Sequence, residues 1–275
     1  MQSGFILIDK PVDWTSHDVV ARIRGIARQQ AKKEPNTYNL KPKVGHAGTL
    51  DPFATGLLIV GVGRDATKRL DEFKGMKKEY IATIRLGATS DTFDRTGTIQ
   101  ETNHKKQTIS KSHISNVLNS FIGKQSQLPP MYSAKKVGGK KLYELARKGI
   151  EIERQPSEIE MYEIELLEMK TLPPSRGELE GGYAEAKTSV DRQPHPNPPL
   201  SKGRELSSLS TITLRVSCST GTYIRTLAHD IGQVLGTGAY CEELRRTKIG
   251  EYSVENAIEV EDLTVDNIQN DIRSL

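Results

Sequence analysis

The sequence predicts an α+β fold in which a mixed, mostly antiparallel central sheet is flanked by helices and loops. Apolar or alternating runs, typical of strands, are interspersed with segments whose apolar residues recur at helical spacing. The two kinds of segment do not alternate one for one, as a purely parallel sheet built from βαβ units would require. The 275 residues suffice for one large domain or two small ones.

Strands are predicted where apolar residues run continuously or at every second position. The predicted strands are 5–8, 57–62, 80–86, 159–169 and 211–219. The last of them alternates through Ile212, Leu214, Val216 and Cys218. This alternation predicts that Cys218 occupies a buried strand position.

Helices are predicted where apolar residues share one face and a capping residue precedes them. Ser16 is the expected cap of the first helix, whose apolar face is formed by Val19, Val20, Ile23, Ile26 and Ala27. The other predicted helices are 64–73, a segment beginning at Ser110, 140–148, 223–235 and 261–268. Between these elements we expect a basic loop over 31–43 and a polar loop over 87–97.

Charge is distributed unevenly along a chain whose formal net charge is only +4. Residues 1–44 hold eight Lys and Arg against four acids, and residues 135–148 hold six against one. The sign reverses over 251–275, where seven acids face Arg273 alone. Two basic patches on a nearly neutral body fit a polyanionic partner, whereas ordinary solvated surface is the alternative when the patches are taken alone.

The segment 172–209 differs in composition from the rest. It contains six of the thirteen prolines and an approximate repeat, Pro-Pro-Ser-Arg-Gly-Glu-Leu at 173–179 and Pro-Pro-Leu-Ser-Lys-Gly-Arg-Glu-Leu at 198–206. Such a segment buries too little apolar surface to offset its ordering entropy. We therefore expect a disordered insert between two strands that could pair as a hairpin; a partner-binding loop is the alternative.

Several classes of protein are disfavoured. The two cysteines, Cys218 and Cys241, have no metal-ligand spacing, and the six histidines include no His-x-x-x-His pair. No apolar run reaches about 18 residues, and the first residues do not have the pattern of a secretory signal. We expect a cytoplasmic protein that has no metal site and no contact with a membrane.

The segment 45–56, Gly-His-Ala-Gly-Thr-Leu-Asp-Pro-Phe-Ala-Thr-Gly, combines three glycines, an imidazole and the Asp51 carboxylate. Glycines at this density allow positive φ values and a close approach of the backbone to a ligand. The apolar strand 57–62 follows and would hold the carboxylate in a fixed place. Taken alone, Asp51-Pro52 is more commonly a turn in which Asp51 caps a helix and Pro52 begins it, and only the rest of the chain favours the functional interpretation.

Other stretches, in this order and spacing, complete a pattern: Asp9-Lys10-Pro11, Lys78-Glu79-Tyr80, Met131 to Lys135, Gly221 to Leu227, and Leu244-Arg245-Arg246-Thr247. Together with segment 45–56, they closely resemble the TruB family of tRNA pseudouridine-55 synthases. The resemblance covers about residues 4–260 without the insert. Segment 45–56 is specific to this family, and segment 221–227 is specific to pseudouridine synthases more broadly.

The resemblance implies the pseudouridine synthase fold and isomerisation of the uridine at position 55 in the tRNA T-loop. The N1–C1′ bond breaks, the base rotates and C5 joins C1′, so no cofactor or metal is expected. Asp51 matches the catalytic aspartate nucleophile, and attack at C1′ or at C6 of the base both remain open. The target base must be flipped out of the folded loop, and the expected partner is the T-arm of tRNA.

The resemblance assigns roles to six further residues. Tyr80 matches the active-site tyrosine, and Arg225 matches the arginine that pairs with the catalytic carboxylate. The matches to substrate-binding positions are His46, Tyr223 and Leu244, together with Lys10, which belongs to a structural motif near the site. Without the resemblance, Tyr80, Tyr223 and Leu244 could be ordinary core residues and Arg225 a surface residue whose stem is buried.

The expected organisation is a catalytic domain over 1–250, interrupted by the insert, and a short acidic segment over 251–275. The resemblance to family members that carry a C-terminal RNA-binding domain therefore weakens at this end, and we expect a monomer. Two alternatives to the enzyme remain: a non-catalytic tRNA-binding or tRNA-folding chaperone, and a nucleotide-binding enzyme suggested by Gly61-Val62-Gly63. A lone Gly-x-Gly is a weak signal for the second.

Overall fold

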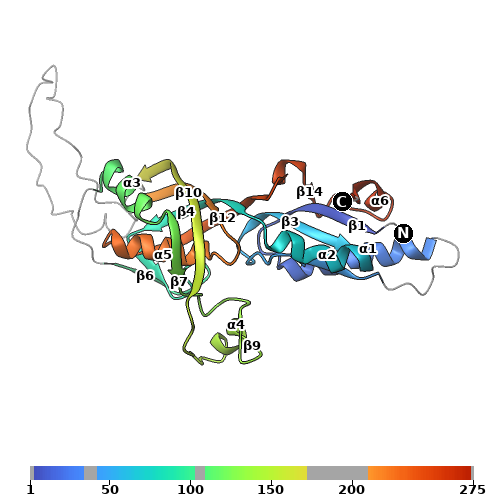
Figure 1. The fold of residues 1–275 in the computed structure, drawn as a ribbon, viewed down its shortest axis with the longest axis horizontal. Helices are drawn as coiled ribbons and strands as arrows, with labels where there is room; N and C mark the ends of the chain where they lie inside the picture. The colour runs from blue at the N-terminus through green and yellow to red at the C-terminus, as the bar shows by residue number, and fades with distance from the viewer. Residues whose placement is uncertain (1–2, 34–41, 103–108, 172–209, 274–275) are drawn as a thin grey trace, which may run out of the picture.

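A twisted sheet runs through the whole molecule in the computed structural model, which describes residues 3–33, 42–102, 109–171 and 210–273 (Figure 1). Ten of the described strands join it, and eight of them follow the order β14-β1-β3-β12-β4-β11-β10-β7. Only the β14–β1 and β12–β3 pairings of this sheet are parallel. The predicted α+β class with a mixed, mostly antiparallel sheet is confirmed.

The larger half of the sheet is built from β4 (Lys78–Leu86), β10 (Ser157–Thr171), β11 (Ser210–Cys218) and β12 (Ala239–Ile249), with β7 (Gly123–Gln127) at its edge. Helices α3 (Lys111–Ser120) and α5 (Ile224–Val234) pack on it. Alternate residues of the strands, such as Ile212, Leu214, Val216 and Cys218, are fully buried in this core. The prediction for Cys218 is therefore confirmed.

The smaller half is built from β1 (Gly4–Lys10), β2 (Val44–Ala47) and β3 (Thr55–Val62), between α1 (Ser16–Lys33) and α2 (Arg64–Lys74). Neighbouring strand residues point to opposite faces. One face of β1 and β3 packs with α1, and the other packs with α2, so both faces are buried. This explains why both strands read as continuous apolar runs.

Strands β10 and β11 pair antiparallel as far as Thr171 and Ser210, as the proposed hairpin requires. The predicted insert 172–209 lies outside the described residues. The predicted basic loop 31–43 differs at its start, because α1 continues to Lys33; residues 34–41 of that loop are also outside the described part.

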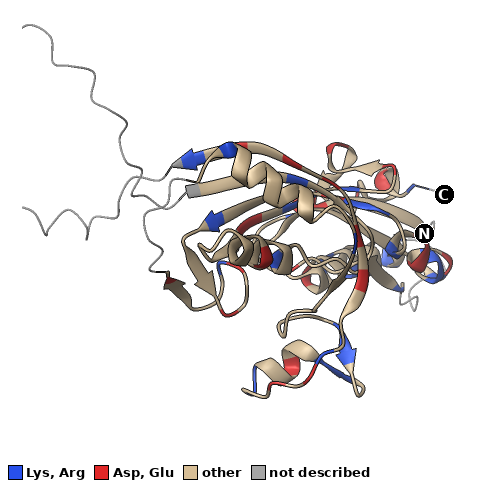
Figure 2. Cartoon of the chain, turned by 60° about the vertical axis from the view of Figure 1, so that its left-hand side comes forward, with Lys and Arg blue, Asp and Glu red and all other residues tan. Residues whose placement is uncertain are grey.

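A small arm projects from the body between β7 and β10 (Figure 1). It contains the two-stranded sheet of β8 (Lys136–Val137) and β9 (Lys140–Lys141), followed by α4 (Leu142–Ala146). The predicted helix over 140–148 is therefore too long, because its first two residues pair with β8. Lys and Arg recur along this arm (Figure 2).

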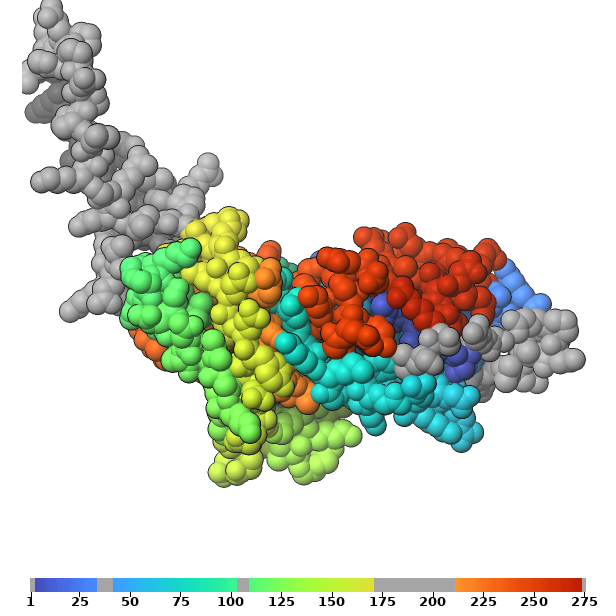
Figure 3. All heavy atoms as spheres, turned by 45° about the horizontal axis from the view of Figure 1, so that its top comes forward, coloured from blue at the N-terminus to red at the C-terminus, as the bar shows by residue number. Residues whose placement is uncertain are grey.

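The C-terminal residues pack against the smaller half of the sheet, beside the N-terminal strand (Figure 3). After β13 (Tyr252–Ser253) and a 3-10 turn (Val254–Asn256), β14 (Ile258–Glu259) pairs with β1. Val260, Leu263, Ile268 and Ile272 are buried in the core of that half. The segment is acidic but is part of the folded body.

Three predicted local structures are wrong. Ser16 is the first residue of α1 and not its cap, because the Thr15 hydroxyl accepts the hydrogen bond from the Asp18 amide at 3.1 Å. The helix expected over 261–268 is a series of turns, and α6 covers only Ile268–Asp271. The side chains of Thr264 and Asn267 each accept a hydrogen bond from the other's backbone amide, which is the arrangement of a helix N-cap, so helical turns begin after Thr264 and not at Glu261. The polar loop expected over 87–97 contains β5 (Ala88–Ser90), which pairs with β6 (Ile99–Glu101). Within the described ranges, no helix is long and apolar enough to cross a membrane.

Candidate active site

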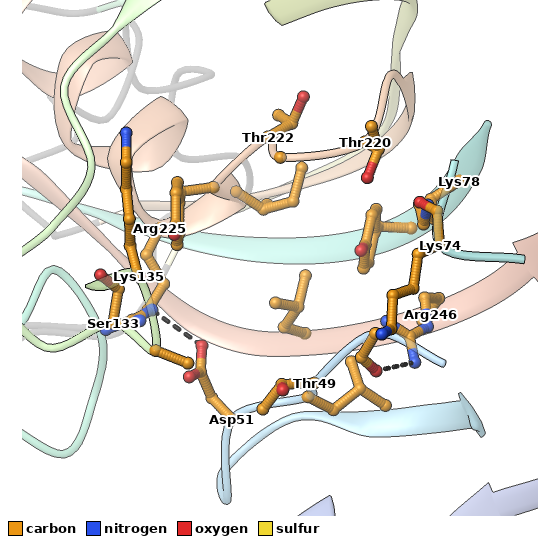
Figure 4. Close-up of a pocket in the computed structure, with 18 of the residues that line it drawn as sticks. Thr49, Asp51, Lys74, Lys78, Ser133, Lys135, Thr220, Thr222, Arg225 and Arg246 are labelled. Atoms are coloured by element: carbon orange, nitrogen blue, oxygen red, sulfur yellow. Dashed lines mark hydrogen bonds and ion pairs between the residues drawn. The ribbon is translucent and has the colours of Figure 1, made fainter. Parts of the chain in front are cut away.

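A cavity of about 340 Å³ opens where the two halves of the sheet meet (Figure 4). The segment before β3, the start of β4, the loop leading into α5, and β12 all contribute to its wall. The lining includes Asp51, Tyr80, Tyr223, Arg225 and Leu244. Five of the seven predicted site residues, which lie far apart in the sequence, thus meet in one cavity.

The segment that carries Asp51 is fixed from several sides. Ser16 accepts a hydrogen bond from the Leu50 amide at 2.9 Å and donates one to the Leu50 carbonyl at 3.2 Å. The fully buried Lys10 donates to the carbonyl of Pro52 at 3.2 Å, and Arg246 donates to that of Gly48 at 3.1 Å. Because the backbone is held on both sides, the carboxylate of Asp51 has a defined position.

Lys10 does not line the cavity. Its ammonium also donates to the carbonyls of Pro11 at 2.7 Å and Trp14 at 2.6 Å, so it ties the end of β1 to the Asp51 segment. Burial lowers the pKa of Lys10 to about 8, against the opposing effect of Asp51. The hydrogen bonds of Lys10 are thus made to backbone carbonyls around the Asp51 segment and not to groups in the cavity.

Arg225, on the first turn of α5, is buried and connects two carboxylates. Its Nε lies 2.9 Å from Oδ2 of Asp51, and its Nη1 lies 3.0 Å from Oδ2 of Asp94. Further hydrogen bonds run to the carbonyls of Thr92 at 3.1 Å and Tyr132 at 2.7 Å. All three guanidinium nitrogens are used, so its orientation toward Asp51 is fixed.

Asp94 is the site residue that sequence reasoning missed. Its side chain is only 4% exposed, and its Oδ1 accepts from the Thr92 hydroxyl at 2.9 Å and the Thr96 amide at 2.9 Å. Phe93 between them has a φ of 64°, rare for a bulky residue, and its ring stacks on His229 at 4.1 Å. Asp94 with Thr96 two residues later has the sequence pattern of an ordinary turn. Nothing in the sequence therefore indicated that the Asp94 carboxylate also pairs with Arg225.

The ionisation of Asp51 depends on opposing influences. Burial raises its pKa above the ordinary value; Arg225 opposes the rise, and the nearby charge of Asp94 adds to it. The side chain remains 35% exposed, toward the cavity. Asp51 is therefore the carboxylate that a ligand in the cavity can reach, whereas Asp94 is enclosed behind Arg225.

The tyrosines and Leu244 supply apolar walls. Tyr80 is 8% exposed, and burial raises the pKa of its hydroxyl. The backbone of Tyr223 is held by the Gln127 side chain, which accepts from its amide at 2.8 Å and donates to its carbonyl at 3.0 Å. A planar base could lie between such surfaces.

His46 is not among the residues that line the cavity. It lies in β2, and burial together with the charges of Arg246 and Lys74 lowers its pKa, which favours the neutral imidazole. Among the described residues, no group of three or more His, Cys, Asp or Glu is arranged to hold a metal ion.

Two family models match most of the chain. The family model of TruB family pseudouridylate synthase (N terminal domain) matches residues 35–180, and that of the tRNA pseudouridylate synthase B C-terminal domain matches residues 225–273. The tRNA pseudouridine synthase B of Syntrophomonas wolfei is 42% identical over 272 residues, covering 99% of this chain and 75% of the relative. That of Desulfotalea psychrophila is 43% identical, covering 93% and 85%.

Solved structures show the same fold. A chain of a Cbf5-Nop10-Gar1 complex superposes with a TM-score of 0.57 at 29% identity over 96% of this chain. A chain of an H/ACA RNP bound to a substrate RNA containing 2′-deoxyuridine gives 0.56 at 26% identity over 98%. This chain spans 54% and 56% of the length of those two chains. By these matches the chain belongs to the TruB family of pseudouridylate synthases.

Proposed function

We propose that this enzyme converts uridine to pseudouridine at position 55 in the T-loop of tRNA, with Asp51 as the nucleophile. The single observation that carries the proposal is the partly exposed Asp51 carboxylate, held 2.9 Å from the buried Arg225 inside a cavity with aromatic walls. The names of the relatives, tRNA pseudouridine synthase B, support tRNA as the substrate.

The reaction is an isomerisation in which atoms and electrons balance. The N1–C1′ bond breaks, a C5–C1′ bond forms, the proton on C5 leaves and N1 gains a proton. Asp51 bonds transiently to C1′ or to C6 and is released unchanged in either case, so both routes fit its role as a nucleophile. Arg225 would keep the carboxylate ionised and aimed, because an adjacent positive charge favours the charged form.

The cavity walls suit a flipped uracil. Tyr80 and Tyr223 would face the base, and Leu244 would complete the apolar wall. The Tyr80 hydroxyl could help the C5 proton to leave. Extruding a base from a folded loop costs a few kcal/mol, and stacking on aromatic faces offsets part of that cost. His46 would then contact nucleotides outside the cavity.

The T-arm is the proposed recognition element, bound in part by the basic arm that precedes β10. Lys136, Lys140, Arg147 and Lys148 are exposed there. The acidic C-terminal segment should repel phosphates beyond the T-arm. We therefore expect an isolated T-stem-loop to be nearly as good a substrate as whole tRNA. A kcat/KM preference for whole tRNA above about a hundredfold, roughly 2.7 kcal/mol, would contradict this expectation.

The proposed organisation is a catalytic domain over 1–250 with an insert at 172–209 and an acidic segment over 251–275, although the C-terminal family model crosses residue 250. Because one chain supplies all the residues of the site, a monomer suffices. The proposed place of action is the cytoplasm.

The alternative to the enzyme is a non-catalytic tRNA-binding or tRNA-folding chaperone. Tight binding of tRNA by the wild type without conversion of uridine would favour this alternative.

The test is Asp51→Asn, which keeps the shape of the side chain but removes the nucleophile. Pseudouridine is mapped in an unmodified tRNA transcript after a single turnover, and tRNA binding is measured in parallel. We expect conversion to be lost while binding stays within about threefold of the wild type. The matched control is Asp65→Asn at an exposed position of α2, which should convert normally. Conversion by Asp51→Asn within tenfold of the wild type, with deamidation excluded, would refute the assignment.

A further inference from the structure

The cavity has two chemically different ends. Asp51, Arg225 and Lys135 lie at one of them, and Lys74, Lys78 and Arg246 gather at the other (Figure 4). Among the described residues that line the cavity, Asp51 is the only acid, and its ion-pair partner is Arg225 at the same end. The second end therefore carries positive charge that the proposed chemistry at Asp51 does not use.

Two of these cations are buried. Arg246 is 1% exposed and donates to the carbonyls of Leu57 at 2.8 Å and Gly48 at 3.1 Å. Lys78 is 6% exposed and donates to the carbonyls of Lys74 and Met76, each at 2.5 Å. Carbonyl dipoles replace part of the lost hydration, but they carry no net charge.

No carboxylate of the described residues lies within ion-pair distance, 4.0 Å, of Arg246 or Lys78. Buried charges in proteins are normally paired. Burial and the neighbouring Arg246 lower the pKa of Lys78 to about 8, as expected where like charges are held together without an anion. An anion that entered the cavity would supply the missing counter-charge.

Lys74 is the exposed member of the group. It lies on the last turn of α2, its side chain is 51% exposed, and its partner Asp71, at 2.6 Å, is 84% exposed. Ion pairs this exposed contribute about 0–1 kcal/mol and are easily exchanged. Lys74 can therefore turn from Asp71 toward an anion in the cavity without disturbing the fold.

We propose that this end of the cavity is a phosphate subsite that binds a backbone phosphodiester directly flanking the target uridine. The proposal rests on the proposed function, since it takes the ligand to be a uridine within RNA. Uracil itself is neutral, whereas every internal uridine carries a phosphodiester on each side of its ribose. Binding one of them would set the distance between C1′ and Asp51 and would favour a nucleotide within a strand over a free nucleoside.

The test is a double-mutant cycle on the T-stem-loop. Substrates carry one uncharged methylphosphonate linkage, either 5′ or 3′ of the target uridine, and their dissociation constants are measured with wild-type enzyme and with Lys74→Gln. We expect one of the two linkages to weaken wild-type binding by about fivefold. The same linkage should weaken binding to Lys74→Gln by less than about twofold, because the charge that it would contact is absent.

Lys77→Gln is the matched control, because it removes the same charge three residues away. Lys77 is exposed, lies over the ring of Tyr162 at 5.2 Å and does not line the cavity. The methylphosphonate linkage should weaken binding to Lys77→Gln as much as it weakens binding to the wild type. Equal penalties in wild type and Lys74→Gln at both linkages, or no penalty in the wild type, would overturn the subsite. Failure of the wild type to convert an unmodified tRNA transcript would overturn the proposed function, while the binding cycle on the stem-loop would still decide the subsite.

Discussion

Replacing Arg225 with Met tests the arrangement on which the site depends. The substitution approximately keeps the volume of the side chain but removes every polar contact of the guanidinium. Asp94, 4% exposed, loses its 3.0 Å ion pair, and the carbonyls of Thr92 and Tyr132 lose a donor. Removing one partner of a buried ion pair costs about 3–5 kcal/mol, so the free energy of unfolding should fall by that amount at neutral pH.

The same substitution should raise the pKa of Asp51 further, because burial and Asp94 remain while the opposing influence of Arg225 is lost. Protonated Asp51 is a poor nucleophile. The Asp51 carboxylate also loses the contact that orients it. For both reasons we expect the single-turnover rate at pH 7 to fall by about a hundredfold or more. Raising the pH through the elevated pKa should restore part of the rate.

The free energy of unfolding of Arg225→Met should fall as pH rises, whereas its rate should increase. A carboxyl whose pKa is higher in the folded than in the unfolded protein binds more protons when folded, so stability decreases as pH rises from about 4 toward the elevated value. The variant should therefore be most stable where it is least active. Adding Asp94→Asn to Arg225→Met removes the second unpaired carboxylate, and should recover part of the lost stability and of the rate.

The measurements are urea unfolding and single-turnover conversion, each over a pH series. Arg215→Met is the control, because Arg215 forms a strand-surface pair with Glu165 in which both side chains are more than 40% exposed. It should change stability by no more than about 0.5 kcal/mol. The reasoning is refuted if Arg225→Met converts tRNA within tenfold of the wild type at pH 7, or loses no more stability than Arg215→Met.

Three further predictions follow from the site and the sheet. Tyr80→Phe keeps the ring, so tRNA binding should stay within about twofold, and a larger loss would show that the hydroxyl contributes to binding. Asp94→Asn removes a charge that raises the pKa of Asp51, so the acid limb of the pH–rate profile should move to lower pH; an unmoved limb would contradict the coupling. Excising 172–209 and closing β10–β11 with an Asn-Gly turn should lower Tm by less than about 10 °C, and a larger drop would mean that the segment stabilises the fold.

The pattern of burial was readable from the sequence where the local signal was strong. Strands β1 and β3 of the smaller half were predicted from apolar runs, whereas β2 was not; Ser110 was identified as the start of a helix that it does cap, accepting from the His113 amide at 3.2 Å. Segment 45–56 marked Asp51 as a candidate, because a glycine-rich turn before a buried strand fixes a carboxylate. Prediction failed at short polar elements, where the hydrogen-bond partner and not the residue's own propensity decides the conformation. It also failed at β12, whose pairing with β4 contains two register shifts that interrupt the alternation of buried and exposed residues.

Contacts between distant segments were decided only by the tertiary structure. Asp94 lies 131 residues before its partner Arg225, and Lys10 lies 42 residues before the Pro52 carbonyl that it binds. Contacts between residues so far apart in the chain leave no periodic pattern in the sequence. Strand pairing and helix packing determine which loops come together. The sequence by itself determined strands β1, β3, β4, β10 and β11, the main helices and the nucleophile candidate, but not β12, which lies in the middle of the sheet. The ion-pair network behind Asp51 and the cationic end of the cavity depend on the order of strands in the sheet, which local patterns do not encode.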